Sequence, residues 1–86
     1  MKDFYTFKVR TNEAMEAMKN AMSTLPEVNF ETKTKFNITI KAMEATTGAW
    51  LTPEQVNKMI NELYSHNGIK VTQYSNHKNT IFVSYS

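Results

Sequence analysis

The sequence predicts an α+β fold in which two helices cover one face of a mainly antiparallel sheet, in the order β-α-β-β-α-β-β. Two segments repeat apolar residues every three or four positions, which is typical of amphipathic helices. The segments around them alternate apolar with polar residues, which is typical of half-buried strands. The chain has 86 residues with two glycines, two prolines and no cysteine. We therefore expect one domain, residues 1–86, without disulfides.

The first strand is expected over Asp3–Arg10, where the odd-numbered residues from Tyr5 to Val9 are apolar. Thr11 follows it, and its hydroxyl can accept a hydrogen bond from the first turn of a helix. Apolar residues then recur at spacings of three and four until Pro26, which ends the run. They are Ala14, Met15, Met18, Met22 and Leu25. The methionines in this row indicate core packing.

A hairpin is predicted between Val28 and Ile40, where every large apolar residue has an even number. One strand over this whole range would exceed the usual length of about three to ten residues. A three-residue loop at Lys33-Thr34-Lys35 keeps these apolar residues on one face, toward the core. The second strand of the hairpin then starts at Phe36, and the stretch from Met43 to Trp50 is expected to form a loop.

The segment Leu51–Val56 predicts the start of a second helix. Thr52 is the expected cap, Pro53 takes the first helical position, and Gln55 completes a capping box. Asn67-Gly68 supplies a left-handed stop. The core face of this helix is apolar at helical spacing. Its residues are Val56, Met59, Ile60, Leu63 and Tyr64.

Two further strands, Ile69–Ser75 and Thr80–Tyr85, are predicted to form a closing hairpin around the turn Asn76–Asn79. Their odd-numbered apolar residues share one face. The complete order corresponds to a ferredoxin-like sandwich with one extra strand, and this arrangement leaves the second face of the sheet uncovered.

The uncovered sheet face is predicted to collect positive charge, although the net charge of the chain is only +2. Six of the ten basic residues lie on this face or at the tip of the first hairpin, namely Lys8, Arg10, Lys33, Lys35, Lys41 and Lys70. Three aromatic residues share the face, namely Phe4, Tyr74 and Phe82. Glu31 is the one acidic residue predicted there, so cations and rings are expected to form a common surface.

Aromatic rings among cations suit single-stranded nucleic acid, because bases stack on the rings while Lys and Arg neutralise phosphates. We therefore expect RNA or other single-stranded nucleic acid as the partner, with the six basic residues on phosphates and the three aromatic residues on bases. The predicted layout resembles the RNA recognition motif, whose four-stranded βαββαβ sheet presents stacking aromatics on its open face. The resemblance is one of topology. The predicted third strand, Lys35–Lys41, lacks that family's glycine- and aromatic-rich octamer, so no binding residue is carried over.

The sequence gives little support to a catalytic function. The two histidines, His66 near a helix end and His77 in a turn, lack a metal-ligand spacing. Phosphate-binding loops, nucleophile elbows and dinucleotide fingerprints are absent from the sequence. We expect a protein that is not an enzyme and uses neither cofactor nor metal. No apolar run approaches the length of a signal peptide or membrane span, so a cytoplasmic location is expected.

Trp50 supports a competing class, a protein-binding inhibitor or adaptor. This side chain either covers the core, which we favour, or anchors a partner protein. The aromatic sheet face or an exposed edge strand would serve the same purpose, and the face would also suit a homodimer interface. The composition, rich in Asn, Lys, Thr and Met, resembles the small host-takeover proteins of large tailed bacteriophages. That resemblance implies an effector that binds a host or defence component, a protein or an RNA, in the bacterial cytoplasm.

Overall fold

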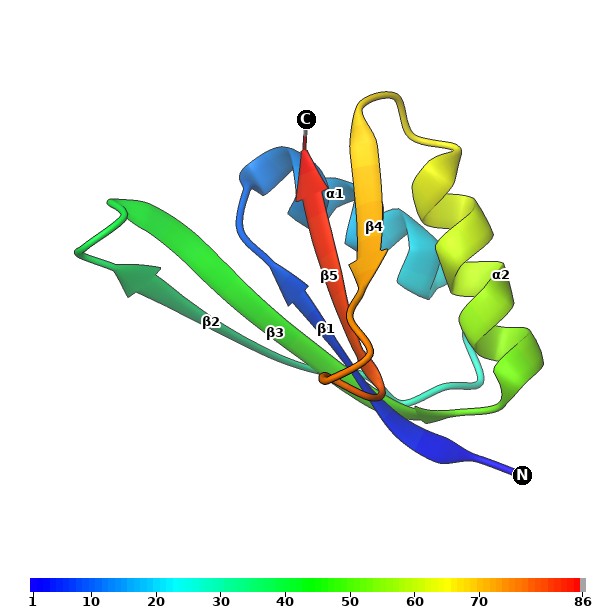
Figure 1. Cartoon of the computed structure of the whole chain (residues 1–86). Helices are drawn as coiled ribbons and strands as arrows, with labels where there is room; N and C mark the ends of the chain where they lie inside the picture. Colours follow the sequence, from blue (N-terminus) through cyan, green and yellow to red (C-terminus); the bar gives the residue numbers. More distant parts are fainter. Residues whose placement is uncertain (86) are drawn as a thin grey trace.

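The computed structural model describes residues 1–85, which form two helices and five strands in the predicted order (Figure 1). The elements are β1 (Asp3–Val9), α1 (Asn12–Ser23), β2 (Glu31–Asn37), β3 (Ala42–Leu51), α2 (Pro53–Tyr64), β4 (Ile69–Gln73) and β5 (Thr80–Tyr85). The α+β class is confirmed.

The five strands form one mixed sheet in the order β2-β3-β1-β5-β4. The central strand β1 runs antiparallel to β3 and parallel to β5, while β2 with β3 and β4 with β5 are antiparallel pairs. β5 therefore lies between β1 and β4, and the ferredoxin-like order, with β4 beside β1, is not confirmed. Both strands of the closing hairpin alternate in the same way, so alternation alone does not say which of them pairs with β1.

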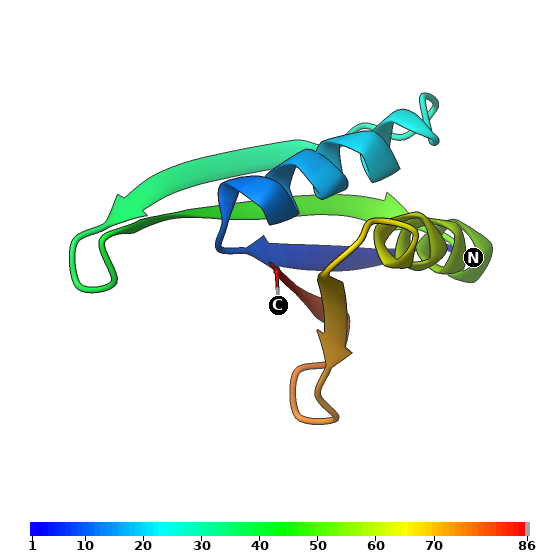
Figure 2. The ribbon, with the colours of Figure 1, turned by 90° about the horizontal axis from the view of Figure 1, so that it is seen from above.

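Both helices pack on one face of the sheet, leaving the other face uncovered (Figure 1 and Figure 2). The buried side chains of α1 and α2 form a single cluster with odd-numbered residues of the strands. The largest fully buried apolar side chains are Phe7, Val9, Met18, Leu51, Met59, Leu63, Ile81 and Val83. This confirms the predicted core face of the first strand, the methionine row of the first helix and the parity of the closing hairpin.

The predicted helix starts are confirmed at the atomic level. The Thr11 hydroxyl accepts a hydrogen bond from the Ala14 amide at 3.0 Å. At the start of α2 the Gln55 amide donates to the Thr52 hydroxyl at 3.2 Å, and the Thr52 amide donates to Gln55 Oε1 at 2.8 Å. Gly68 adopts the predicted left-handed backbone with a φ of 84°. The helix itself ends at Tyr64, a few residues before the predicted stop.

The prediction for the first hairpin is wrong in its register. Lys33-Thr34-Lys35 lies inside β2, and the turn falls at residues 38–41, where the sequence predicts a strand facing the core. Phe36, Ile38 and Ile40 are exposed as a result. The predicted loop from Met43 to Trp50 forms most of β3, which pairs with the whole length of β1.

A local turn and the packing of β3 both favour the actual register. The Asn37 side chain accepts hydrogen bonds from the amides of Thr39 and Ile40, which stabilises a turn at this point. The inward residues of β3 include Ala45, Thr47 and Ala49, which are buried against the rest of the core. Their small side chains resemble loop composition in the sequence, yet they allow close packing under the helices.

Candidate nucleic-acid interface

The face of the sheet away from the helices, called the open face, consists of the even-numbered residues of β1, β3, β4 and β5 and the odd-numbered residues of β2. The register establishes this set, because directly paired residues share a face. Lys8 of β1 pairs with Thr46 of β3 and with Phe82 of β5. Phe82 in turn pairs with Thr72 of β4. Four strands thus bring Lys8 and Phe82 to the middle of one surface.

A pocket of about 450 Å³ opens on this face. Its charged and aromatic lining comes from five different parts of the chain: Lys8, Arg10, Lys35, Glu44, Tyr74 and Phe82. Cations and rings therefore line the same hollow, as a stacked base with a neighbouring phosphate requires.

Three rings gather at the β4–β5 side of this pocket. The Tyr74 and Phe82 ring centroids are 5.4 Å apart at an interplanar angle of 71°. His77 lies 5.8 Å from Phe82 and 6.4 Å from Tyr74, again edge to face. Edge-to-face contacts are the geometry that aromatic pairs prefer, so they favour these ring orientations.

A second aromatic pair lies further along the open face. Phe4 and Trp50 occupy paired positions on β1 and β3, and their ring centroids are 5.5 Å apart at an angle of 73°. Trp50 is 61% exposed, so the favoured interpretation of this residue, a cover for the core, is wrong. A smaller hollow of about 290 Å³ adjoins the pair and is lined by Lys2, Glu31 and Gly48 among others.

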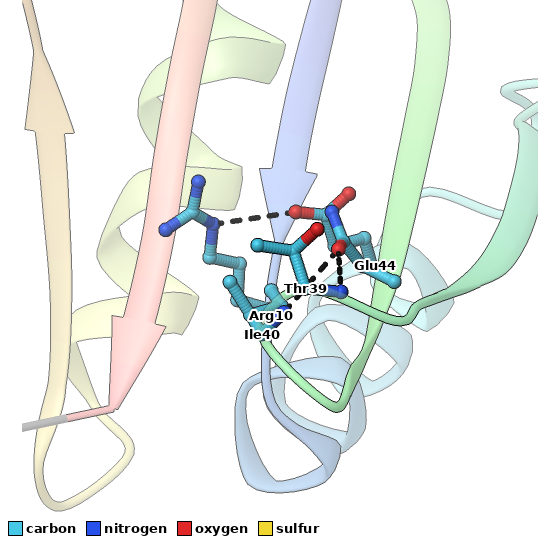
Figure 3. Close-up of polar contacts among 5 residues, drawn as sticks. Arg10, Thr39, Ile40 and Glu44 are labelled. Carbon is cyan, nitrogen blue, oxygen red and sulfur yellow. Dashed lines mark hydrogen bonds and ion pairs between the residues drawn. The ribbon is translucent and has the colours of Figure 1, made fainter.

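The charge of the open face is positive despite two acidic residues. Glu31 lies there as predicted, and Glu44 lies opposite Lys35. Glu44 Oε1 is 3.6 Å from Arg10 Nε, so one cation is already paired (Figure 3). Lys8, Lys33, Lys35 and Lys70 make no ion pair within residues 1–85. Their ammonium groups remain available to an anionic partner.

Eight of the nine predicted site residues lie on the open face or border its pocket. Lys8, Lys70, Phe4 and Phe82 do so in the predicted strands, and Tyr74 does so directly after β4. Arg10 directly follows β1 and lines the pocket. Lys33 and Lys35 reach the face as strand residues of β2, not as a loop.

Lys41 is the exception, because it lies in the turn between β2 and β3 with a φ of 53°.

Sequence reasoning missed three residues of this surface, namely Glu44, Trp50 and His77. The first two belong to β3, and their even numbers would have placed them on the open face had the segment been taken as a strand. His77 joins the ring cluster from the turn before β5, where no periodic signal exists.

No protein-family model, curated protein or solved structure matches this chain. No helix within residues 1–85 is long and apolar enough to cross a membrane. In the same range, no three His, Asp or Glu side chains gather closely enough to hold a metal ion.

Proposed function

We propose that this chain binds RNA or other single-stranded nucleic acid on the open face. The observation that carries the proposal is the 450 Å³ pocket, which is lined both by the rings of Tyr74 and Phe82 and by Lys8 and Lys35. A base stacked on an aromatic ring contributes about 1 to 3 kcal/mol, and this contribution tolerates any base. The adjoining lysines would neutralise the phosphates on either side of it.

The second ring pair, Phe4 with Trp50, supports a path for the nucleic acid over the open face. Phe4 and Lys8 are four residues apart on β1, which corresponds to about 13 Å along the strand. Lys8 is paired with Phe82, so the two ring clusters lie roughly this far apart. A single nucleic-acid strand lying along β1 would meet rings at both ends, with Lys8 and Lys33 at the level of Phe82.

Replacement of Lys8 and Lys35 by glutamate tests the proposal directly. Binding of a labelled single-stranded RNA of about 12 nucleotides is measured by fluorescence anisotropy between about 50 and 200 mM salt. Each lost phosphate contact lowers the slope of log affinity against log salt by about 0.7, so the double variant should lose about 1.4. Its affinity should fall at every salt concentration.

Lys19→Glu with Lys58→Glu is the matched control, because it changes the net charge equally on the helices α1 and α2. This variant should bind RNA with nearly the wild-type salt slope. An equal loss of RNA affinity and of salt slope in both double variants would show that only the total charge matters. It would reject the open face as the binding site.

The same rings also suit a protein partner, the competing function, because Trp50 and Phe4 are exposed. Wild-type protein that binds no RNA at low salt, or binds it without salt dependence, would favour that function.

A further inference from the structure

Three exposed apolar side chains lie at the end of the β2–β3 hairpin. We call residues 36–43 the finger; they comprise the turn and the strand ends that carry it. Phe36 is 65% exposed, Ile38 81% and Ile40 41%. The finger projects past the end of β1 in both views of the fold (Figure 1 and Figure 2). Apolar side chains gathered at a projecting tip are a common mark of an interaction site.

The finger is held in one shape. Asn37 Oδ1 accepts hydrogen bonds from the Thr39 amide at 2.9 Å and the Ile40 amide at 3.3 Å. β2 and β3 remain paired up to Asn37 and Ala42, at the base of the turn. Lys41 closes the turn with a left-handed backbone conformation, which residues other than glycine rarely adopt. Ile38 and Ile40 are therefore presented in a defined geometry.

Positive charge surrounds this apolar tip. Lys33 and Lys35 precede it on β2, and Lys41 lies within it. The nearest carboxylate on β3, Glu44, is already paired with Arg10 (Figure 3). The three lysines make no ion pair among the described residues 1–85. An apolar tip among such lysines fits a partner that is anionic and that also offers an apolar surface into which side chains can insert.

The finger adjoins the pocket of the open face. Lys35 and Glu44 line that pocket, and each lies one residue outside the finger. A nucleic-acid strand leaving the pocket at this edge would next meet the turn that carries Ile38 and Ile40, whereas Phe36 pairs with Met43 on the opposite face of the sheet. Stacked bases satisfy both requirements of the tip, because they are apolar on their faces and flanked by phosphates.

We propose that the finger is an apolar wedge that packs against the end of a duplex, so that the preferred ligand is a junction between single-stranded and double-stranded RNA. This inference rests on the proposed nucleic-acid function of the open face. Isoleucine and phenylalanine side chains inserted at base steps unstack them in other complexes. Unstacking a base pair is least costly where the neighbouring nucleotides are already single-stranded. A junction is therefore the favoured ligand.

The experiment compares two RNAs with the same single-stranded tail, one free and one joined to a hairpin duplex, at one salt concentration. Wild-type protein should bind the tailed hairpin about tenfold tighter, which corresponds to about 1.4 kcal/mol. Ile38→Ser with Ile40→Ser should reduce this preference to near unity and leave the affinity for the free strand unchanged. Thr39→Ser, a conservative change in the same turn, should retain the full preference.

A base analogue placed at the junction gives a second readout. 2-Aminopurine fluoresces more strongly when unstacked, so wild-type protein and Thr39→Ser should raise its emission, whereas the double serine variant should not. Ile38 and Ile40 are exposed, so the variant should keep the wild-type circular dichroism spectrum.

Three results would overturn the wedge. Equal wild-type affinity for the two RNAs would do so, as would a double serine variant that weakens both equally. The third result is binding to phosphatidylglycerol vesicles, or dimerisation in solution, that is lost in the double serine variant. Vesicle binding would instead assign the finger to a membrane, and dimerisation would assign it to a second copy of the chain. Wild-type protein that binds neither RNA would reject the proposed function itself, which is a distinct outcome.

Discussion

At the residue scale, Gly48 shows how a single missing side chain shapes the open face. A Cβ atom at this position would lie 2.6 Å from Cζ of Phe4, because the far edge of the Phe4 ring lies close to the glycine. The same ring contacts Trp50 edge to face. The glycine is thus needed for the close approach of Phe4 rather than for any unusual backbone angle.

Replacement of Gly48 by alanine should displace the Phe4 ring from Trp50. The lost ring contact costs about 0.5 to 1.5 kcal/mol, and alanine recovers a similar amount in a strand, so the free energy of unfolding should change by less than about 1 kcal/mol. Trp50 is the only tryptophan, so its emission reports the local change. The spectrum should shift, and Phe4→Ala should shift it in the same direction. An unchanged spectrum in Gly48→Ala would contradict the packing of Phe4 on Trp50.

At the scale of elements, the sequence predicts features that depend on neighbouring residues better than features that depend on which strands pair. The start of α2 was predictable because Thr52, Pro53 and Gln55 act within one turn of the chain. The β2–β3 hairpin was not, because its register depends on how β3 pairs with β1, far away in sequence. The residues of the candidate site also fall into a group that the sequence predicts and a group that depends on strand pairing. Lys8 and Phe82 follow from strand alternation, whereas Trp50 required knowledge that residues 42–51 form a strand.

The capping box of α2 gives a prediction at this scale. Thr52→Ala removes the hydroxyl that accepts from the Gln55 amide, and it should lower the free energy of unfolding by about 1 kcal/mol. For a domain of this size that corresponds to a Tm lower by about 4 to 8 °C, measurable by circular dichroism. Thr52→Ser retains the hydroxyl and should stay near the wild-type Tm. A serine variant as unstable as the alanine variant would show that the hydroxyl is not the cause.

At the scale of the whole molecule, one core joins both helices to β1, β3, β4 and β5, whereas β2 contributes no side chain to it. Met18 of α1 is fully buried in the same cluster as Met59 of α2 and Phe7 of β1. A small domain with a single core is expected to unfold as one cooperative unit. The open face contributes little to this core, so its cations and rings can be replaced with limited effect on stability.

Met18→Ala should therefore destabilise the entire fold. Truncation of a fully buried methionine costs about 2 to 5 kcal/mol. Helix loss, followed by far-ultraviolet circular dichroism, and the change in Trp50 emission should occur at the same lowered temperature, although Met18 and Trp50 lie on different layers. Separate midpoints for the two signals would show that the sheet and the helices unfold independently.

The position of β5 has a consequence for how the chain acquires its structure. β1 is bordered by β3 on one side and by β5 on the other, and Val9 is paired with Val83. During synthesis β1 emerges long before β5, which is its second neighbour. Until then, one edge of β1 and the part of α1 that packs against β5 remain without their partner. Completion of the fold is thus expected to follow translation of β5, and the long loop that this pairing closes makes folding slower than in a protein of local contacts.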